Sequence, residues 1–289
     1  MKTLKESILN RTNHSGEGFK AQRRELIEKW LIEQDIKKYT IKDDFTIDVN
    51  GNVNLELKDL TELPDYIQFG VVNGYFNCGF NQLTTLRGVP RIVKDSFDCG
   101  FNDLDSLEGA PERVGKDFNC YNNHLTSLKG APKKVKEFNC SNNNLTSLEG
   151  APKIVESFEC DNNQLTSLEG APKEVRENFD CRSNNLTSLK GSPKYIDKGF
   201  NCSENKLTSL EGAPERVGDF NCIFNKLTSL EGAPKKVEGS FDCSYNQLTS
   251  LEGAPKEVRI NFYCLSDKTQ FTEEDVKKVC NVNGKIYTK

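Results

Sequence analysis

The sequence predicts a solenoid, in which a short structural unit is repeated and stacked so that one curved parallel β-sheet runs along the molecule. Two observations carry this prediction. Ten of the eleven cysteines recur every 20 or 21 residues, each with a phenylalanine two positions before it. Hydrophobic residues make up only 35% of the 289 residues, which fits the thin core and large surface of a repeat protein. The ten cysteines are Cys78, Cys99, Cys120, Cys140, Cys160, Cys181, Cys202, Cys222, Cys243 and Cys264.

Each position of the repeated unit, V-x-(2 or 3)-F-x-C-x-x-N-x-L-T-S-L-E-G-A-P, has a physical reason. Phe and Cys alternate with a polar residue, so both face one side of a short strand. The Asn amide can form hydrogen bonds with backbone groups of the turn that have no partner in a β-sheet. The two leucines fill the core behind the strand. Glu-Gly-Ala-Pro turns the chain, because Gly permits positive φ and Pro fixes φ.

This unit resembles the leucine-rich repeat, L-x-x-L-x-L-x-x-N-x-L, with Phe and Cys in its strand core positions. Its short period and recurring Pro are similar to those of the bacterial short-repeat class, and the match covers residues 53–264. A period of 20 or 21 residues leaves no room for a full helix on the convex side. Short extended or 3-10 segments are therefore expected there, as the resemblance also implies.

A solenoid exposes its core at both ends, so helical caps are expected to flank the repeats. Four parts of the chain follow from this division. Residues 1–18 are polar and are expected to be a flexible N-terminus, and residues 19–52 are an N-terminal cap of helix and strand. Residues 53–264 are the leucine-rich repeats, and residues 265–289 are the C-terminal cap.

Within the caps, the sequence predicts particular elements. An amphipathic helix is expected over residues 19–36, followed by two strands around a turn at Asn50 and Gly51. Thr272 is expected to open a short C-terminal helix, with Asp275 in the capping-box position.

The N-terminal phrase K-E-S-I-L-N, together with I-D-V-N-G-N-V-N-L and L-T-E-L-P further on, resembles hypothetical proteins of bacteriophages that carry the same L-T-S-L-E-G-A-P repeats. The resemblance implies a phage origin, and hence a place in the host cytoplasm. It implies no activity.

Composition excludes several classes of function. Lys and Arg number 39 against 43 Asp and Glu, so the net charge of −4 gives no reason to expect nucleic-acid or membrane binding. No signal peptide or apolar run of membrane-spanning length is found. The periodic cysteines read as core residues of a chain kept in reducing, cytoplasmic conditions. With two histidines and no base beside a nucleophile, we expect no enzyme activity and no cofactor or metal.

The polar residues on the strands are expected to project from the concave face. Those between Phe and Cys are Asn, Asp or Glu, whereas lysines gather after Pro, so an acidic concave face and a basic outer surface are predicted. Two groups of aromatic residues stand where other units carry Ser, Asn or Asp. Apolar groups rimmed by polar residues are typical of contact sites. The predicted partner-binding residues are Phe80, Phe101, Tyr121, Glu159, Asp161, Asp180, Arg182, Ile223, Phe224, Asp242 and Tyr245.

The leading hypothesis is therefore a non-catalytic scaffold, monomeric, that binds a protein or peptide through this face. Several alternatives stay open. The polar residues could serve only to keep a sheet face soluble, and the aromatic residues could pack against the caps. The chain could instead be a structural or adhesin-like component of a virion. An effector with a catalytic domain is disfavoured because only 25 residues follow Cys264, and mimicry of nucleic-acid charge is disfavoured because Asn alternates with acid.

Overall fold

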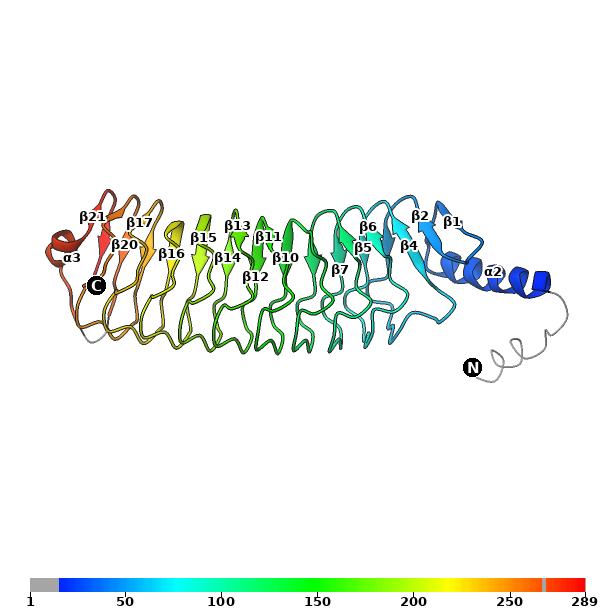
Figure 1. Ribbon diagram of the computed structural model, residues 1–289, viewed down its shortest axis with the longest axis horizontal. Coiled ribbons are helices and arrows are strands. Elements are labelled where there is room, and N and C mark those ends of the chain that lie inside the picture. The colour runs from blue at the N-terminus through cyan, green and yellow to red at the C-terminus, as the bar shows by residue number, and fades with distance from the viewer. Residues whose placement is uncertain (1–15, 267–268, 289) are drawn as a thin grey trace.

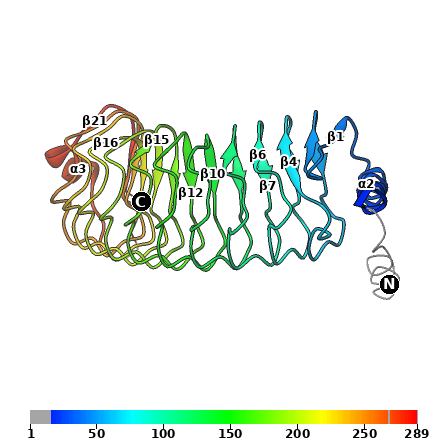
Figure 2. The ribbon, with the colours of Figure 1, turned by 45° about the vertical axis from the view of Figure 1, so that its right-hand side comes forward.

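A parallel β-solenoid of about eleven turns accounts for the described residues, 16–266 and 269–288, of the computed structural model (Figure 1). Helix α2 (Gly16–Glu33) lies at one end of the rod and helix α3 (Glu273–Val279) at the other. Figure 2 shows the turns stacked face to face between them. The parallel repeat solenoid predicted from the cysteine spacing is confirmed.

Each turn contributes a short strand that includes the repeated phenylalanine or its replacement, and we call these the Phe strands. They pair in parallel and in register, so that Phe97 lies opposite Phe118 and Phe138 opposite Phe158. This is the sheet expected from the F-x-C pattern. The Phe strands are β3 (Val53–Asn54), β5 (Phe76–Asn77), β7 (Phe97–Asp98), β9 (Phe118–Asn119), β10 (Glu137–Asn139), β12 (Ser157–Glu159), β14 (Phe179–Asp180), β18 (Phe241–Asp242), β20 (Phe262–Tyr263) and β22 (Ile286–Tyr287).

A second set of strands, which we call the Val strands, was not predicted. Two or three residues separate the repeated Val or Ile from the Phe that follows, and this spacing accounts for the difference between 20- and 21-residue turns. Strands β15 (Tyr195–Asn201) and β16 (Arg216–Asn221) run through both sets. The Val strands are β2 (Ile47–Val49), β4 (Phe69–Val72), β6 (Ile92–Val93), β8 (Arg113–Val114), β11 (Ile154–Val155), β13 (Glu174–Val175), β17 (Lys236–Val237), β19 (Glu257–Val258) and β21 (Asn281–Val282).

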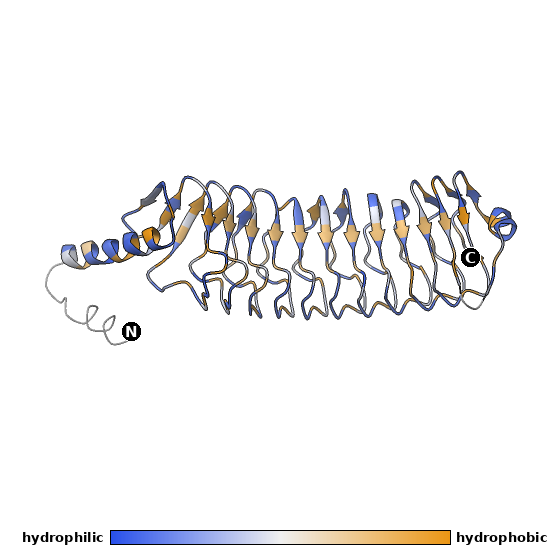
Figure 3. Cartoon of the chain, turned by 180° about the vertical axis from the view of Figure 1, so that it is seen from behind, coloured by the Kyte–Doolittle hydropathy of each residue, from blue (hydrophilic) through white to orange (hydrophobic). Residues whose placement is uncertain are grey.

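The core is a column of phenylalanine rings with thiols and leucines around it. From Phe76 to Phe262, neighbouring ring centroids lie between 5.3 and 5.7 Å apart. Figure 3 shows the hydrophobic residues of the strands, in orange, recurring along the rod. All eleven cysteines are free and buried, as predicted for core residues. The thiols also form hydrogen bonds between turns: Cys160 Sγ donates to the Asp180 carbonyl of the next turn at 3.3 Å.

The buried asparagine of each repeat fastens its turn to the preceding one. Asn163 Nδ2 lies 3.1 Å from the carbonyl oxygens of Cys160 and Asp161 in its own turn and from that of Cys140 in the turn before. Its Oδ1 accepts a hydrogen bond from the Leu145 N–H at 3.0 Å. The predicted role of this side chain, to satisfy backbone groups outside the sheet, is confirmed.

The chain reverses through a type II β-turn with glycine at the third position. In one such turn the Ala110 N–H donates to the Leu107 carbonyl at 3.0 Å, and Gly109 has a φ of +88°. A glycine is required there because other residues are disfavoured at that φ. The expected 3-10 segments are wrong for the described residues, where turns and bends take their place. Glycine at positive φ interrupts the run of right-handed residues that a 3-10 helix needs.

The N-terminal elements differ from the expected ones. Helix α2 covers residues 16–33, so it begins and ends three residues before the predicted 19–36. The predicted flexible segment 1–18 is therefore helical from Gly16 onward, and its residues 1–15 lie outside the described chain. Ile27, Trp30 and Leu31 are buried on one side of the helix.

Strands β2 and β3 flank the predicted turn at Asn50 and Gly51, but they do not pair with each other as the strands of a hairpin would. The antiparallel pair is formed instead by β1 (Tyr39–Ile41) with β2. Asn50 and Gly51 lie between β2 and β3, which belong to different sheets. Strand β2 pairs in parallel with β4, and β3 with β5, so β2 and β3 do not pair with each other and each has a parallel partner in the next turn.

At the C-terminus the predicted helix is confirmed and an additional turn is found. Thr272 is the N-cap of α3, and the reciprocal hydrogen bonds with Asp275 complete the capping box. After the helix, β21 pairs with β19 and β22 pairs with β20, so the sheets extend beyond residue 264. The spacing of Val282 and Ile286, equal to that of Val258 and Phe262, could have revealed this turn. That both terminal helices are needed as caps stays a prediction.

Candidate functional site

Three parallel columns of side chains make up the candidate surface, which we call the strand-end face. Column one lies between Phe and Cys on the Phe strands and includes Glu159, Asp180 and Asp242. Columns two and three lie one and two residues after Cys, beyond the ends of the strands. Column two includes Tyr121, Asp161, Arg182 and Ile223, and column three includes Phe80, Phe101, Phe224 and Tyr245. The predicted aromatic residues thus border the sheet instead of projecting from its strands.

Column three has an unusual backbone conformation. Phe80, Phe101, Phe224 and Tyr245 have φ between +51° and +54°. The same left-handed conformation recurs in the intervening turns, where the residues are Asn, Ser or Glu. Bulky residues are disfavoured there, whereas Asn is tolerated. The four aromatic side chains are also 40–50% exposed. The fold itself therefore does not require them.

At the N-terminal end of the strand-end face, the aromatic residues form one continuous patch. The rings of Phe80 and Phe101 are stacked with centroids 4.3 Å apart, and Tyr121 meets Phe101 edge to face at 5.3 Å. Tyr121 also lies over Gly100, where an added Cβ would come within 2.6 Å of its ring. Leu57 occupies column three in the turn before and is exposed as well. We call these four residues (Leu57, Phe80, Phe101 and Tyr121) the N-terminal patch.

A second patch lies towards the other end. Phe224 and Tyr245 stack with centroids 4.8 Å apart and rings within 11° of parallel. Ile223, half-buried in column two, is their neighbour in sequence. We call these three residues the C-terminal patch. Sequence analysis missed a further stacked pair, Tyr263 and Tyr287 at 4.6 Å, because the turn that holds Tyr287 was not recognised.

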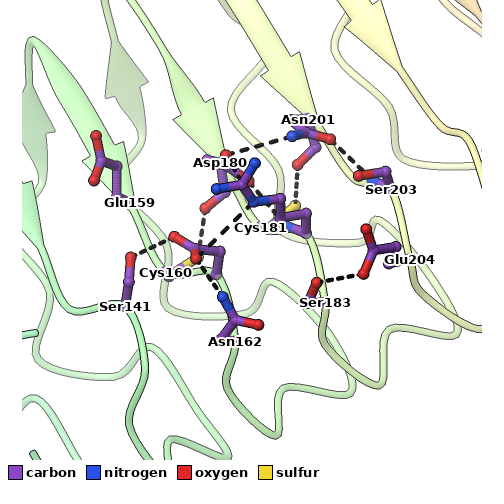
Figure 4. A network of polar contacts seen from close by, with 12 residues as sticks. Ser141, Glu159, Cys160, Asn162, Asp180, Cys181, Ser183, Asn201, Ser203 and Glu204 are labelled. Carbon is purple, nitrogen blue, oxygen red and sulfur yellow. Dashed lines mark hydrogen bonds and ion pairs between the residues drawn. The ribbon is translucent and has the colours of Figure 1, made fainter. Parts of the chain in front are cut away.

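In the turns between the patches lies an acidic centre of Glu159, Asp161, Asp180 and Glu204. Figure 4 labels Glu159, Asp180 and Glu204. Arg182 reaches Asp180 at 3.6 Å and Asp161 at 4.0 Å. Asp161 is only 7% exposed and also accepts hydrogen bonds from Ser141 Oγ and, at 2.6 Å, from Asn162 Nδ2. Asp161 is therefore a fixed part of the surface rather than a free charge.

Hydrogen bonds from neutral groups hold the two outer carboxylates of the centre. Asn139 Nδ2 donates to Glu159 at 2.6 Å, and Ser183 Oγ donates to Glu204 at 2.9 Å. Both carboxylates are exposed. Their negative charge is directed to solvent, where a cationic group of a partner could meet it.

Desolvation by surrounding groups raises the pKa of several column-one carboxyls, including that of Glu159, which is desolvated in part although its side chain is exposed. For Asp98, Glu159 and Asp180, desolvation is the largest cause of the raised pKa. Hydrogen bonds oppose it at Asp98 and Asp180, where the N–H two residues further on donates to the carboxylate. The ionised form of these carboxyls is therefore less favourable in the folded state than in the unfolded chain, which lowers the free energy of unfolding.

The buried thiols offer no reactive site. Burial raises the pKa of every cysteine, and even the least desolvated, Cys264 and Cys280, have a pKa of about 11. A thiol that stays protonated is a poor nucleophile and metal ligand. In the part of the chain that the structure describes, no cluster of three His, Cys, Asp or Glu is placed to hold a metal ion. The described helices also include none of the length and apolarity that crossing a bilayer requires.

The opposite side of the solenoid is less basic than expected. An open groove of about 630 Å³ runs over the Glu-Gly-Ala-Pro turns and is lined by Lys153, Lys173 and Lys194, among others. Carboxylates accompany the lysines there, however. Lys190 pairs with Glu169 at 3.0 Å, and Lys194 pairs with a glutamate of the next turn at 3.1 Å. Some lysines of the predicted basic outer surface are therefore paired with carboxylates of neighbouring turns.

Comparison with known proteins gives matches among solved structures alone. No family model matches the chain, and no curated protein is significantly similar to it. YopM from Yersinia enterocolitica WA-314 aligns over 94% of this chain and 68% of its own, with 18% identity and a TM-score of 0.49. The APL1 leucine-rich repeat domain aligns over 83% and 91%, with 11% identity and a TM-score of 0.41. Both are leucine-rich repeat proteins.

Proposed function

We propose that this chain is a non-catalytic scaffold that binds a protein partner through the strand-end face, its concave side. The observation that carries the proposal is the presence of exposed aromatic side chains at left-handed positions of column three. Asn would stabilise that conformation better, and Asn is what several other turns use. Aromatic residues are enriched at the core of protein interfaces, where a few of them often dominate the binding energy.

The alternative explanations of these side chains fit the structure less well. Packing against the terminal helices does not account for Phe224, which is half exposed. Solubility accounts for Asn and Asp in column one but not for aromatic rings beside them. For the setting of the interaction we propose the cytoplasm of a phage-infected host, with a structural or adhesin-like virion component as the alternative.

The test compares the wild-type chain with a variant that carries Phe224→Asn and Tyr245→Asn. Each substitution introduces the residue that suits a left-handed backbone, so the melting temperature should change little. Both proteins are used for cross-linked capture from an extract of phage-infected host cells, followed by mass spectrometry. Loss of two aromatic anchors should weaken binding of a captured partner by about 2 kcal/mol or more, roughly 30-fold in Kd.

A matched control is Tyr195→Thr, which removes an exposed tyrosine from a Val strand outside the strand-end face. This variant should capture the same proteins as the wild type. Equal capture by the wild type and the Asn double variant would remove the C-terminal patch as the binding site; equal capture by a second variant with Phe80→Asn and Phe101→Asn would remove the strand-end face and direct attention to the groove over the glycine turns.

A further inference from the structure

The two aromatic patches lie at opposite ends of one straight register. In column three, five polar residues separate Phe101 from Phe224, namely Asn122, Asn142, Asn162, Ser183 and Glu204. The patches are therefore six turns apart. At about 4.8 Å between neighbouring strands, this is a separation of about 29 Å along the solenoid.

The surface between the patches is negative. Among the three columns of the intervening turns, Arg182 is the one basic residue, and it is engaged with Asp180 and Asp161. Glu159 and Glu204 accept hydrogen bonds only from neutral donors on either side of that cluster. A partner that spans both patches thus passes over carboxylates that basic side chains would complement.

We propose that the strand-end face binds a single extended, basic peptide segment of a partner protein, anchored by one apolar side chain in each aromatic patch. This inference rests on the proposed function and adds the chemistry and spacing of the partner. An extended chain rises about 3.3 Å per residue, so the two anchors would be about nine residues apart. A helix would need about 19 residues to cover the same distance. Within the two patches most turns contribute a single apolar side chain to the strand-end face, which suits an extended segment better than a helix about 10 Å across.

The probe is a displayed library of random peptides of about 16 residues, long enough to hold both anchors and their flanks. Selection on the purified chain should enrich peptides with two apolar residues about nine positions apart and Lys or Arg between them. A selected peptide should bind at least tenfold more weakly when three residues are deleted between its anchors. Asn substitution of either aromatic pair, Phe80 with Phe101 or Phe224 with Tyr245, should also weaken it at least tenfold. Tyr195→Thr should leave it unchanged.

The outcomes separate this inference from the proposed function. Enriched peptides that ignore the spacing, or that depend on one patch alone, would overturn the two-anchor arrangement while protein binding by the strand-end face stands. The same holds if no peptide is enriched but a protein partner is still captured in a manner sensitive to Phe224 and Tyr245. If neither peptides nor proteins are retained, both ideas are overturned.

Discussion

The buried Asn163 makes four hydrogen bonds, and three of its partners are carbonyl oxygens of two successive turns. Replacing Asn163 with Ala leaves the Leu145 N–H without its partner in a dry environment and removes one hydrogen bond from each of the three carbonyls, which keep a second donor. We expect a loss of about 2–3 kcal/mol in the free energy of unfolding, measured by urea denaturation. The control is Gln164→Ala at the exposed neighbouring position, which should cost less than about 0.5 kcal/mol. Equal losses would show that the asparagine ladder is dispensable.

The charge on column one gives a stability effect with a defined pH dependence. Burial raises the pKa of Asp98, so the folded state disfavours the carboxylate. The stability contribution of this group is full below the ordinary Asp pKa of about 3.9 and is lost as the pH rises through the raised folded value. Asp98→Asn removes that loss and keeps an oxygen to accept the Gly100 N–H.

We therefore expect Asp98→Asn to stabilise the protein at pH 7 by about 0.5 kcal/mol, with no gain below about pH 4. Thermal melting across this range measures the effect. Asp105→Asn, which removes an exposed carboxylate from the same turn, serves as the matched control. A gain for Asp98→Asn that is independent of pH would contradict the assignment to burial of charge.

The sequence predicted residue roles best where one physical requirement dominates. Burial of Phe, Cys and Leu, and the backbone bonds of Asn, follow directly from residue type at a fixed period. Roles at the surface were harder to place. Tyr121 and Phe101 were assigned to the same face, but which column each belongs to depends on where the strand ends, and a left-handed residue after Cys is not visible in a pattern of polarity.

Among the elements, the helix α2 is the one whose burial offers a direct test of capping. The Trp30 ring packs 6.3 Å from that of Phe69, a residue of the Val strand β4. Trp30→Ala should cost about 3–5 kcal/mol if α2 and the first turns unfold together. Far-ultraviolet circular dichroism and size-exclusion chromatography would follow melting and association. A small effect with no aggregation would mean that the helix is an appendage and that the first turn needs no cover.

Element boundaries were the weaker part of the sequence prediction. The Val strands are two residues long in most turns, too short for an alternating pattern to reveal. Asn50 and Gly51 have the composition of a hairpin turn, yet the parallel partners available in the next turn decide the pairing. Conversely, Thr272 and Asp275 were predicted correctly because a capping box is a local arrangement, independent of the rest of the fold.

Over the whole molecule, each turn contacts mainly its neighbours, so stability should vary along the rod. Labelling with a thiol reagent reports this directly. Cys264 and Cys280, with a pKa of about 11 and a position near the C-terminal end, should react first. Cys160, deep in the middle, should react only on global unfolding. Mass spectrometry after proteolysis would give the order, and rapid modification of all thiols in native buffer would contradict the buried ladder.

The bends between Val and Phe strands have a consequence for how such a gene could change. Each bend accepts either two or three residues. One repeat can therefore be duplicated or lost in the DNA, and the remaining Phe rings and Asn side chains would still stack on their new neighbours without repacking. A change in the stretch between the two patches would lengthen or shorten their separation by about 4.8 Å. The number of repeats between the patches would therefore set, in steps of one turn, the length of the ligand that can reach both of them.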